Sequence, residues 1–191
     1  MITRRVAGVG ATVAVLVFGL AAGVGAQSTE SESQENTFSV PQDPSFLIGT
    51  WHITEVIYPG TDREYVEVTV RVCEQELLDL YVVCRMQSNG RGRKRESWFL
   101  VNQHAGEGSI EFVGVFTNVP YKTIYQGQFL ADGSGIDLQS YQVREDAMTP
   151  GTFQTLRFLS EDEFEWRIGI TNPGTPEESV IGIERAVRVS T

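Results

Sequence analysis

The two cysteines are the first residues whose type and spacing could do chemistry. Cys73 and Cys84 lie opposite each other if a hairpin turns between Leu78 and Asp79. Facing positions on antiparallel strands bring side chains close enough for a disulfide, and an exported, oxidising location permits one. We predict this disulfide; the alternative is two free buried thiols. A catalytic thiol is not expected, because no histidine lies nearby in the sequence to activate it.

The two histidines, His52 and His104, give little support for a metal site. A mononuclear site takes three or four ligands, and although Glu55 or Glu107 could join a histidine, no spacing motif demands it. We therefore predict two surface histidines and no bound metal.

No arrangement typical of an active site is recognisable. The segment Asp132–Gly135 has the sequence of a hairpin turn rather than that of a nucleophile elbow, and Gly90–Gly92 is not followed by a helical pattern. We expect no catalytic residue and no cofactor. An isomerase, cyclase or hydrolase that uses an internal cavity stays open as a third interpretation.

The charge distribution argues against a nucleic-acid partner. The chain has 191 residues with 15 Lys and Arg against 25 Asp and Glu, a net charge of -10, and phosphate binding needs a cationic surface. Five basic residues nevertheless gather in one short stretch: Arg85, Arg91, Arg93, Lys94 and Arg95. They could contact an anion or lipid headgroups, but we favour a solvated hairpin loop whose charges protect neighbouring strand edges.

Residues 1–26 have the pattern of a cleaved secretory signal. Arg4 and Arg5 precede a long apolar stretch, and small residues end at Ala26 without a cysteine at the cut. A membrane anchor is the alternative, because about 20 apolar residues can span a bilayer. We predict a secreted or periplasmic protein with no stable span after cleavage; the general and twin-arginine routes both stay open.

The elements that must position any site begin after a polar leader. Residues 27–44 are rich in Ser, Glu and Gln and predict a flexible segment, and residues 45–191 predict one folded domain. That domain is a succession of short segments rich in β-branched and aromatic residues, separated by turn residues. They are Leu47–Ile57, Glu64–Cys73, Leu80–Met86, Glu96–Gln103, Ser109–Thr117, Tyr121–Leu130, Ile136–Val143, Thr152–Leu159, Glu163–Thr171 and Ser179–Val189.

This pattern predicts an all-β fold, either a sandwich or a barrel. Ten strands joined by short loops leave two exposed edges unless the sheet closes, so we favour a single closed antiparallel up-and-down barrel. Apolar residues alternate with polar ones along Val66–Val72 and along Phe164–Ile170. We expect the apolar side chains of both segments to face the barrel interior.

Short motifs resemble known barrel families. Gly49-x-Trp51 resembles the opening motif of lipocalins and of the wider calycin superfamily, and the stretch from Leu47 to Trp51 resembles the opening of nitrobindins, which are ten-stranded haem-binding barrels. Trp98–Leu100, Gly127–Phe129 and Asp162–Trp166 are similar to an aromatic segment, a G-x-F strand and a late strand of bacterial lipocalin-like proteins of the DUF1579 type. The resemblance covers about residues 45–190.

The resemblance implies a barrel whose floor is plugged by Trp51, with Arg185 or Arg188 packed on the indole ring. It also implies that His52 points outward, because neighbouring side chains on a strand alternate. Nitrobindins bind haem through a histidine near the C-terminus. This chain has no histidine after His104, so haem is not expected.

The function that follows is binding of a small apolar or amphipathic molecule inside the barrel. Trp51 and Ile53 should point inward, and Glu55 would be a polar anchor near the mouth, paired with Arg157 or Arg167. Aromatic residues could supply the wall: Trp98, Phe99, Tyr125, Phe129, Tyr141, Phe153 and Trp166. The alternative is a non-catalytic interaction or structural module of the cell envelope whose barrel is filled.

Overall fold

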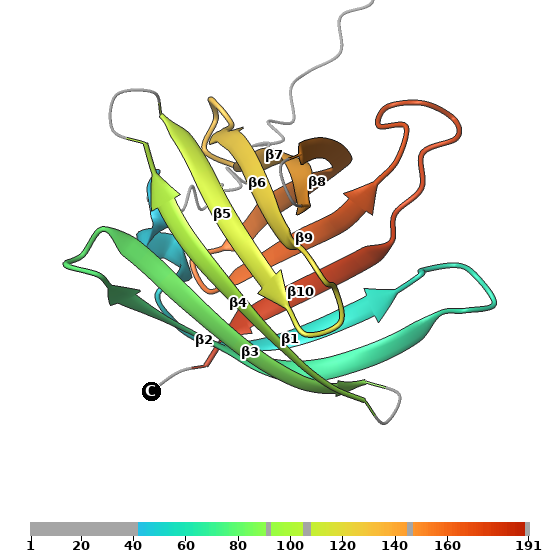
Figure 1. Ribbon diagram of the computed structural model, residues 1–191, viewed down its shortest axis with the longest axis horizontal. Coiled ribbons are helices and arrows are strands. Elements are labelled where there is room, and N and C mark those ends of the chain that lie inside the picture. The colour runs from blue at the N-terminus through green and yellow to red at the C-terminus, as the bar shows by residue number, and fades with distance from the viewer. Residues whose placement is uncertain (1–41, 91–92, 105–107, 145–146, 190–191) are drawn as a thin grey trace, which may run out of the picture. The chain divides into compact units, whose positions relative to one another are not determined.

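The computed structural model describes residues 42–90, 93–104, 108–144 and 147–189. These residues form one 3₁₀ helix and ten antiparallel strands (Figure 1). The elements are η1 (Pro44–Leu47), β1 (Gly49–Ile57), β2 (Tyr65–Glu76), β3 (Tyr81–Gly90), β4 (Arg93–Gln103), β5 (Ser109–Phe116), β6 (Lys122–Phe129), β7 (Gly135–Arg144), β8 (Ala147–Ser160), β9 (Glu163–Ile170) and β10 (Gly182–Arg188).

The sheet is a closed up-and-down barrel, which confirms the predicted fold class. Each strand pairs with its neighbours in the chain, and β1 also pairs with β10, so that the first and last strands close the sheet. All ten predicted strands are present. The largest difference is at β8, which begins at Ala147 rather than Thr152 and includes Pro150. The β7–β8 pairing is irregular between Gln139 and Tyr141, and proline is accepted beside such irregularities.

The predicted signal, residues 1–26, lies outside the described residues, as does most of the predicted leader, residues 27–44. Gln42 already contacts the barrel, because its carbonyl accepts a hydrogen bond of 3.0 Å from the Gln103 side chain. Asp43 then caps η1 by accepting from the Ser45 amide at 2.8 Å. None of the helical structure in the described ranges is long and apolar enough to cross a membrane.

The predicted disulfide is present. Cys73 and Cys84 are direct partners in the β2–β3 register, with their Cα atoms 4.0 Å apart, and their sulfur atoms are bonded. The hairpin between them turns at Leu77, Leu78 and Asp79, which all have a positive φ. The bond therefore fixes the register of this hairpin a few residues from its tip.

Removing this disulfide is expected to lower the free energy of unfolding by about 2–3 kcal/mol, because the bond closes a loop whose ends are 11 residues apart. The test is urea denaturation of the Cys73→Ser/Cys84→Ser double variant against the oxidised wild type. Wild-type protein with a reducing agent is the matched control and should lose the same amount. Equal stability of all three samples would contradict the prediction.

The indole of Trp51 lies at the floor of the barrel beside η1. Trp51 is 1% exposed, and its Nε1 donates to the Leu47 carbonyl at 2.7 Å. The Arg188 guanidinium lies 4.2 Å from the indole centroid, and its Nη2 donates to the Phe46 carbonyl at 3.0 Å. Arg188 rather than Arg185 therefore makes the expected contact with the indole.

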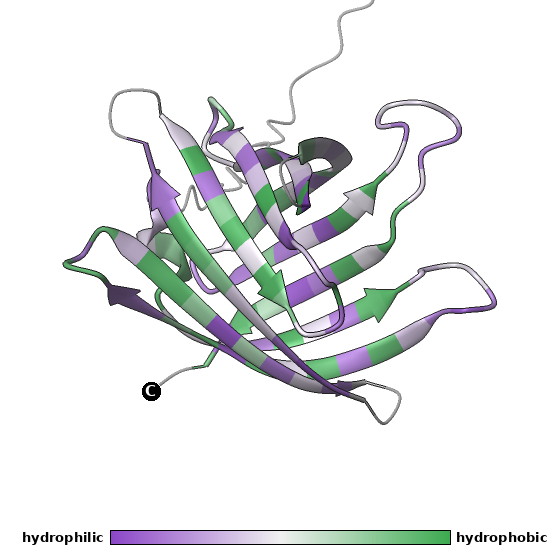
Figure 2. Ribbon diagram, in the orientation of Figure 1, coloured by the Kyte–Doolittle hydropathy of each residue, from purple (hydrophilic) through white to green (hydrophobic). Residues whose placement is uncertain are grey.

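The two predicted apolar faces have opposite outcomes. Phe164 and Trp166 of β9 are buried inside the barrel as expected. The prediction for β2 is wrong: Val68 is 72% exposed, whereas Arg71 is 2% exposed. Polar and apolar residues alternate along β2 in Figure 2, and the polar set faces inward. The reason is that charged side chains from other strands pair with the inward side chains of β2, such as Glu67.

Candidate functional site

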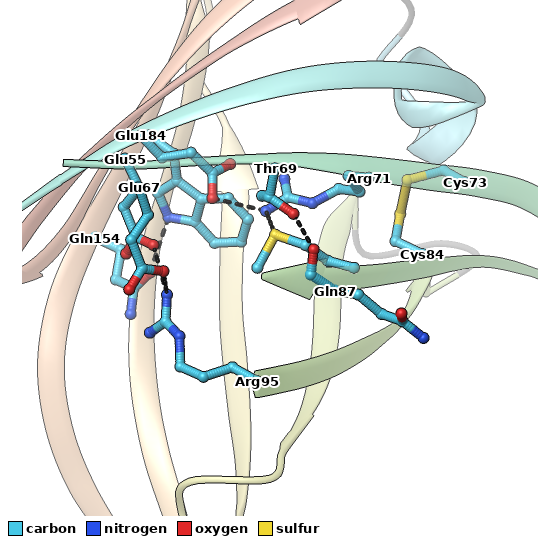
Figure 3. Close-up of polar contacts among 12 residues, drawn as sticks. Glu55, Glu67, Thr69, Arg71, Cys73, Cys84, Gln87, Arg95, Gln154 and Glu184 are labelled. Carbon is cyan, nitrogen blue, oxygen red and sulfur yellow. Dashed lines mark hydrogen bonds and ion pairs between the residues drawn. A yellow bond between two sulfur atoms is a disulfide. The ribbon is translucent and has the colours of Figure 1, made fainter. Parts of the chain in front are cut away.

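Three carboxylates form one inward row at the end of the barrel opposite the Trp51 floor, which we call the barrel mouth. Glu55 of β1 is the direct register partner of Glu67 on β2 and of Glu184 on β10. Direct partners across strands have Cβ atoms roughly 4.5–5.5 Å apart. The three side chains are 15%, 5% and 3% exposed respectively, and Figure 3 shows them together. We refer to Glu55, Glu67 and Glu184 as the carboxylate row.

Two arginines neutralise part of this row. Arg71 Nη2 lies 2.7 Å from Glu184 Oε2, and both side chains are buried. Arg95 enters from β4, where its Nη2 contacts Glu67 Oε2 and lies 3.2 Å from Glu55 Oε2 (Figure 3). Arg95 therefore forms ion pairs with two carboxylates, those of Glu55 and Glu67.

The predicted partners of Glu55 were wrong. Arg157 pairs with Asp137 at 2.6 Å, and Arg167 pairs with Glu178 at 3.3 Å. Both arginines point away from the interior because the residues beside them on their strands, such as Trp166, point inward.

The basic cluster near the β3–β4 turn divides between two environments. Arg85 pairs with Glu76 at 2.7 Å, and Lys94 pairs with Glu96 at 2.7 Å. Arg95 instead faces the carboxylate row. The prediction that the whole basic cluster lies in a solvated loop is therefore wrong for Arg95. Arg91 and the side chain of Arg93 lie outside the described part of the chain.

Aromatic rings surround the charged groups. The Phe99 ring lies 5.4 Å from Phe116 and 5.7 Å from Trp166, between ring centroids. Tyr125 lies 6.2 Å from the Trp166 ring. The Arg71 guanidinium lies 5.6 Å from the Phe99 centroid and 5.8 Å from the Trp166 centroid, which is within cation–π range.

A cavity of about 110 Å³ lies among these groups. Its lining includes members of the carboxylate row, both arginines and the four rings named above, with Asn118 at an exposed position of the rim. Among the described residues, three buried side-chain atoms lack a hydrogen-bond partner: Arg71 Nε, Ser97 Oγ and Glu184 Oε1. All three belong to residues that line this cavity, and we call them the open polar atoms.

The structure brings some of the predicted ligand residues together and separates others. The cavity lining contains Glu55, Tyr125 and Trp166. The core below it contains Trp51, Ile53 and Phe129. Four predicted residues lie on the outer side of the sheet: Trp98, Phe153, Tyr141 and Arg157. Trp98 is 49% and Phe153 is 45% exposed. Tyr141 is the register partner of Ile124, which points outward, and Arg157 forms an ion pair with Asp137.

The inward prediction for Trp98 is corrected by strand geometry. Trp98 and Phe99 are consecutive residues of β4, so their side chains must point to opposite faces, and Phe99 points inward. His52 is exposed on β1, as expected. His104 is exposed as well, and no group of potential ligands in the described ranges is arranged to hold a metal ion.

Sequence reasoning missed Arg71, Arg95, Ser97 and Glu184. One signal could have found Arg71: it has the same parity on β2 as Cys73, and a buried disulfide places that parity inside. The partners from β4 and β10 carry no comparable local signal, because barrel closure brings them to β2 and β1 from distant parts of the chain.

Burial and neighbouring charge shift two ionisable groups of the site. Burial and the Glu184 charge raise the pKa of Glu55 above its usual 4.5, against the opposing effect of Arg95. Burial raises the pKa of Tyr125 to about 12, although hydrogen bonds with Gln154 and Thr123 lower it in part. The Tyr125 hydroxyl is therefore neutral at physiological pH and can form hydrogen bonds.

The raised pKa of Glu55 makes a prediction about pH. The folded state holds this proton more tightly than the unfolded chain, so the contribution of Glu55 to the free energy of unfolding falls as the pH rises above 4.5 through its folded-state pKa. We expect Glu55→Gln to be more stable than wild type at pH 7 by roughly 0.2–1 kcal/mol, the scale of like charges paired across strands. The advantage should shrink at pH 4.

Urea denaturation at both pH values measures this effect. Glu111→Gln is the matched control, because it removes one negative charge from β5, where Glu111 contacts Gln126 rather than the carboxylate row. Parallel pH profiles of Glu55→Gln and wild type would contradict the prediction.

Comparisons with known proteins support the fold. No protein-family model matches the chain, and no curated protein matches it. Solved structures do match: one is the crystal structure of Rv2717c from M. tuberculosis, with a TM-score of 0.54 and 14% sequence identity. The match covers 76% of this chain and 94% of that chain. At this identity the likeness shows a shared barrel architecture.

Proposed function

We propose that this chain is an exported, lipocalin-like barrel that binds a small amphipathic molecule in the mouth cavity. The observation that carries the proposal is that the open polar atoms all belong to residues lining one aromatic-walled cavity. A buried polar group without a hydrogen bond costs about 1–3 kcal/mol, so three such groups around one space favour a bound partner. The rings would hold the apolar part of that partner.

The size of the cavity limits the ligand. A cavity of roughly 150 Å³ takes a benzene molecule, so the cavity of about 110 Å³ accommodates about four or five non-hydrogen atoms. Typical ligand pockets are larger, about 300–1,000 Å³. A longer molecule would therefore place its polar end in the cavity and extend past Asn118 at the rim.

The chemistry of the site favours binding over proton transfer. The carboxylates of the row contact Arg71 and Arg95, and a guanidinium stays protonated in proteins, so it does not act as a base. The pKa of Tyr125 is raised to about 12, so its hydroxyl stays protonated near neutral pH. Glu55 has a raised pKa and can gain or lose a proton, but neither the arginines nor Tyr125 would act as its acid–base partner near neutral pH.

The Cys73–Cys84 disulfide and the signal-like residues 1–26 support export. The lipocalin-like assignment is supported by Gly49-x-Trp51 and by the packing of Arg188 on the indole at the floor.

Native mass spectrometry of the protein purified from its own host tests the proposal. We expect a small added mass that disappears in Ser97→Leu, which fills the cavity from its wall. Val115→Leu on the outer face is the matched control and should keep the added mass. The proposal fails if no mass is added and no small amphipathic probe changes the tryptophan fluorescence.

A second candidate function is contact with a second copy of this chain. The outward valines of β2, which we call the valine stripe, are unusually exposed; they are Val66, Val68, Val70 and Val72, at 57%, 72%, 44% and 39%. An exposed apolar stripe is self-complementary, which suits a two-fold interface. Sedimentation analysis should show a dimer that Val68→Lys converts to a monomer; a monomeric wild type would exclude this candidate.

A further inference from the structure

We propose that the ligand of the mouth cavity is a small organic cation whose ammonium group contacts Glu184 and Glu55. This inference rests on the proposed function and names the class of ligand. It is drawn from the charge balance of the cavity, from one open carboxylate oxygen and from the arrangement of the rings.

The charge balance inside the mouth is negative. The carboxylate row supplies three acidic groups, whereas Arg71 and Arg95 supply two guanidinium groups, and Arg95 is shared between Glu55 and Glu67. At the rim, Lys94 and Glu96 pair with each other and add no net charge. Burial of an uncompensated carboxylate is costly, so the site favours one further positive charge.

The open polar atoms show where that charge would sit. Glu184 uses Oε2 to accept from Arg71, which leaves its Oε1 facing no partner in the described part of the chain. An ammonium group has three donors and no acceptor, so it suits Glu184 Oε1 and the Ser97 hydroxyl. Arg71 Nε is a donor, and an oxygen atom of the ligand or of a water molecule would accept its hydrogen bond.

The rings favour the same kind of ligand. The faces of Phe99 and Trp166 already lie 5.6 and 5.8 Å from the guanidinium of Arg71, so this wall accommodates positive charge. Phe116 continues the wall at 5.4 Å from Phe99 and could cover an alkyl chain. A metal ion fits less well, because no three acidic, histidine or cysteine side chains in the described ranges, the carboxylate row included, are arranged to hold one.

A proton on Glu55 is the natural competitor of this cation. Glu55 faces Glu67 from β2, Glu184 from β10 and Arg95 from β4, and Arg71 lines the same cavity. Burial and the Glu184 charge raise its pKa, so the empty protein holds a proton there more tightly than usual. Affinity for an organic cation should therefore increase as the pH rises from 5 to 7.5.

The test compares three probes of similar size: n-butylammonium, 1-butanol and butyrate. Isothermal titration calorimetry at pH 7 measures affinity, and the indole NMR signal of Trp166, which donates to Gln154 at 2.8 Å, reports whether the probe enters the cavity. We expect n-butylammonium to bind at least about tenfold more tightly than 1-butanol, and butyrate to give no measurable binding.

Two variants sharpen the test. Glu55→Gln should reduce the preference for n-butylammonium over 1-butanol by about tenfold while leaving the fold intact, because it relieves repulsion within the carboxylate row. Glu184→Gln should have the same effect and keeps an oxygen for Arg71. Glu111→Gln on β5 is the control and should leave every affinity unchanged.

The outcomes separate this inference from the proposed function. If 1-butanol or butyrate binds as tightly as n-butylammonium and shifts the Trp166 signal, a ligand site exists but the cation is wrong. If potassium or magnesium ions bind as tightly, an organic cation is wrong. If none of the three probes shifts the Trp166 signal, the proposed ligand site fails along with the cation.

Discussion

Replacing Arg71 with methionine is expected to lower the free energy of unfolding by about 3–5 kcal/mol at pH 7. Arg71 and Glu184 are each 2% exposed and form an ion pair of 2.7 Å inside the barrel. Without the guanidinium, Glu184 would be a buried carboxylate that has lost its ion-pair partner. Glu55, its direct register partner on β1, would then repel it. Urea denaturation followed by tryptophan fluorescence measures the loss.

A double variant separates the charge effect from the packing effect. Arg71→Met/Glu184→Leu removes both charges, and buried pairs replaced in this way often recover most or all of the stability. Arg157→Met on the outer face is the matched control; Arg157 is partly exposed, so the loss should stay below about 1 kcal/mol. The assignment of a buried pair would be wrong if Arg71→Met cost no more than Arg157→Met.

Replacing Trp51 with alanine is expected to cost a similar amount, about 3–5 kcal/mol, for a different reason. The change empties the barrel floor, where the indole lies 4.9 Å from the Phe164 ring, and it removes the hydrogen bond to Leu47. It also removes the ring on which Arg188 packs. Urea denaturation gives the loss, and near-ultraviolet circular dichroism reports the loosened aromatic packing.

Two substitutions serve as controls for the floor. Trp51→Phe keeps part of the ring and should lose less than Trp51→Ala. Trp98→Ala removes an indole of the same size from the outer face, where it is 49% exposed, and should cost less than about 1 kcal/mol. A cost for Trp98→Ala equal to that for Trp51→Ala would contradict the assignment of Trp51 as the buried plug.

The sequence predicts the strands, their order and the disulfide, because each of these depends on local patterns. Segments rich in β-branched residues alternate with turn residues, and short loops make neighbours in the chain pair in space. The positions of Cys73 and Cys84 define a hairpin centre, which the structure confirms. The contact between Trp51 and Arg188 was anticipated from the family resemblance, with Arg185 as the alternative.

The interior of the mouth could not be predicted in the same way. An apolar pattern shows that a strand has two different faces but does not show which one is covered, and β2 turns its polar face inward. That orientation depends on partners far away in the sequence: Arg71 and Glu184 are 113 residues apart. A charge pattern within β2 alone contains no information about β10.

The orientation of β2 also bears on how the chain avoids a wrong fold. If the two faces of β2 were exchanged, the valine stripe would be buried, and Glu67 and Arg71 would be exposed to solvent. The hydrophobic effect alone would favour that arrangement. The Cys73–Cys84 bond fixes the pairing of β2 with β3, so Glu67 and Arg71 stay on the same face of the hairpin as the buried cysteines. A chain that remained reduced would lose this restraint and would be more prone to slipped pairing and aggregation. The disulfide thus ties the orientation of β2 to that of β3.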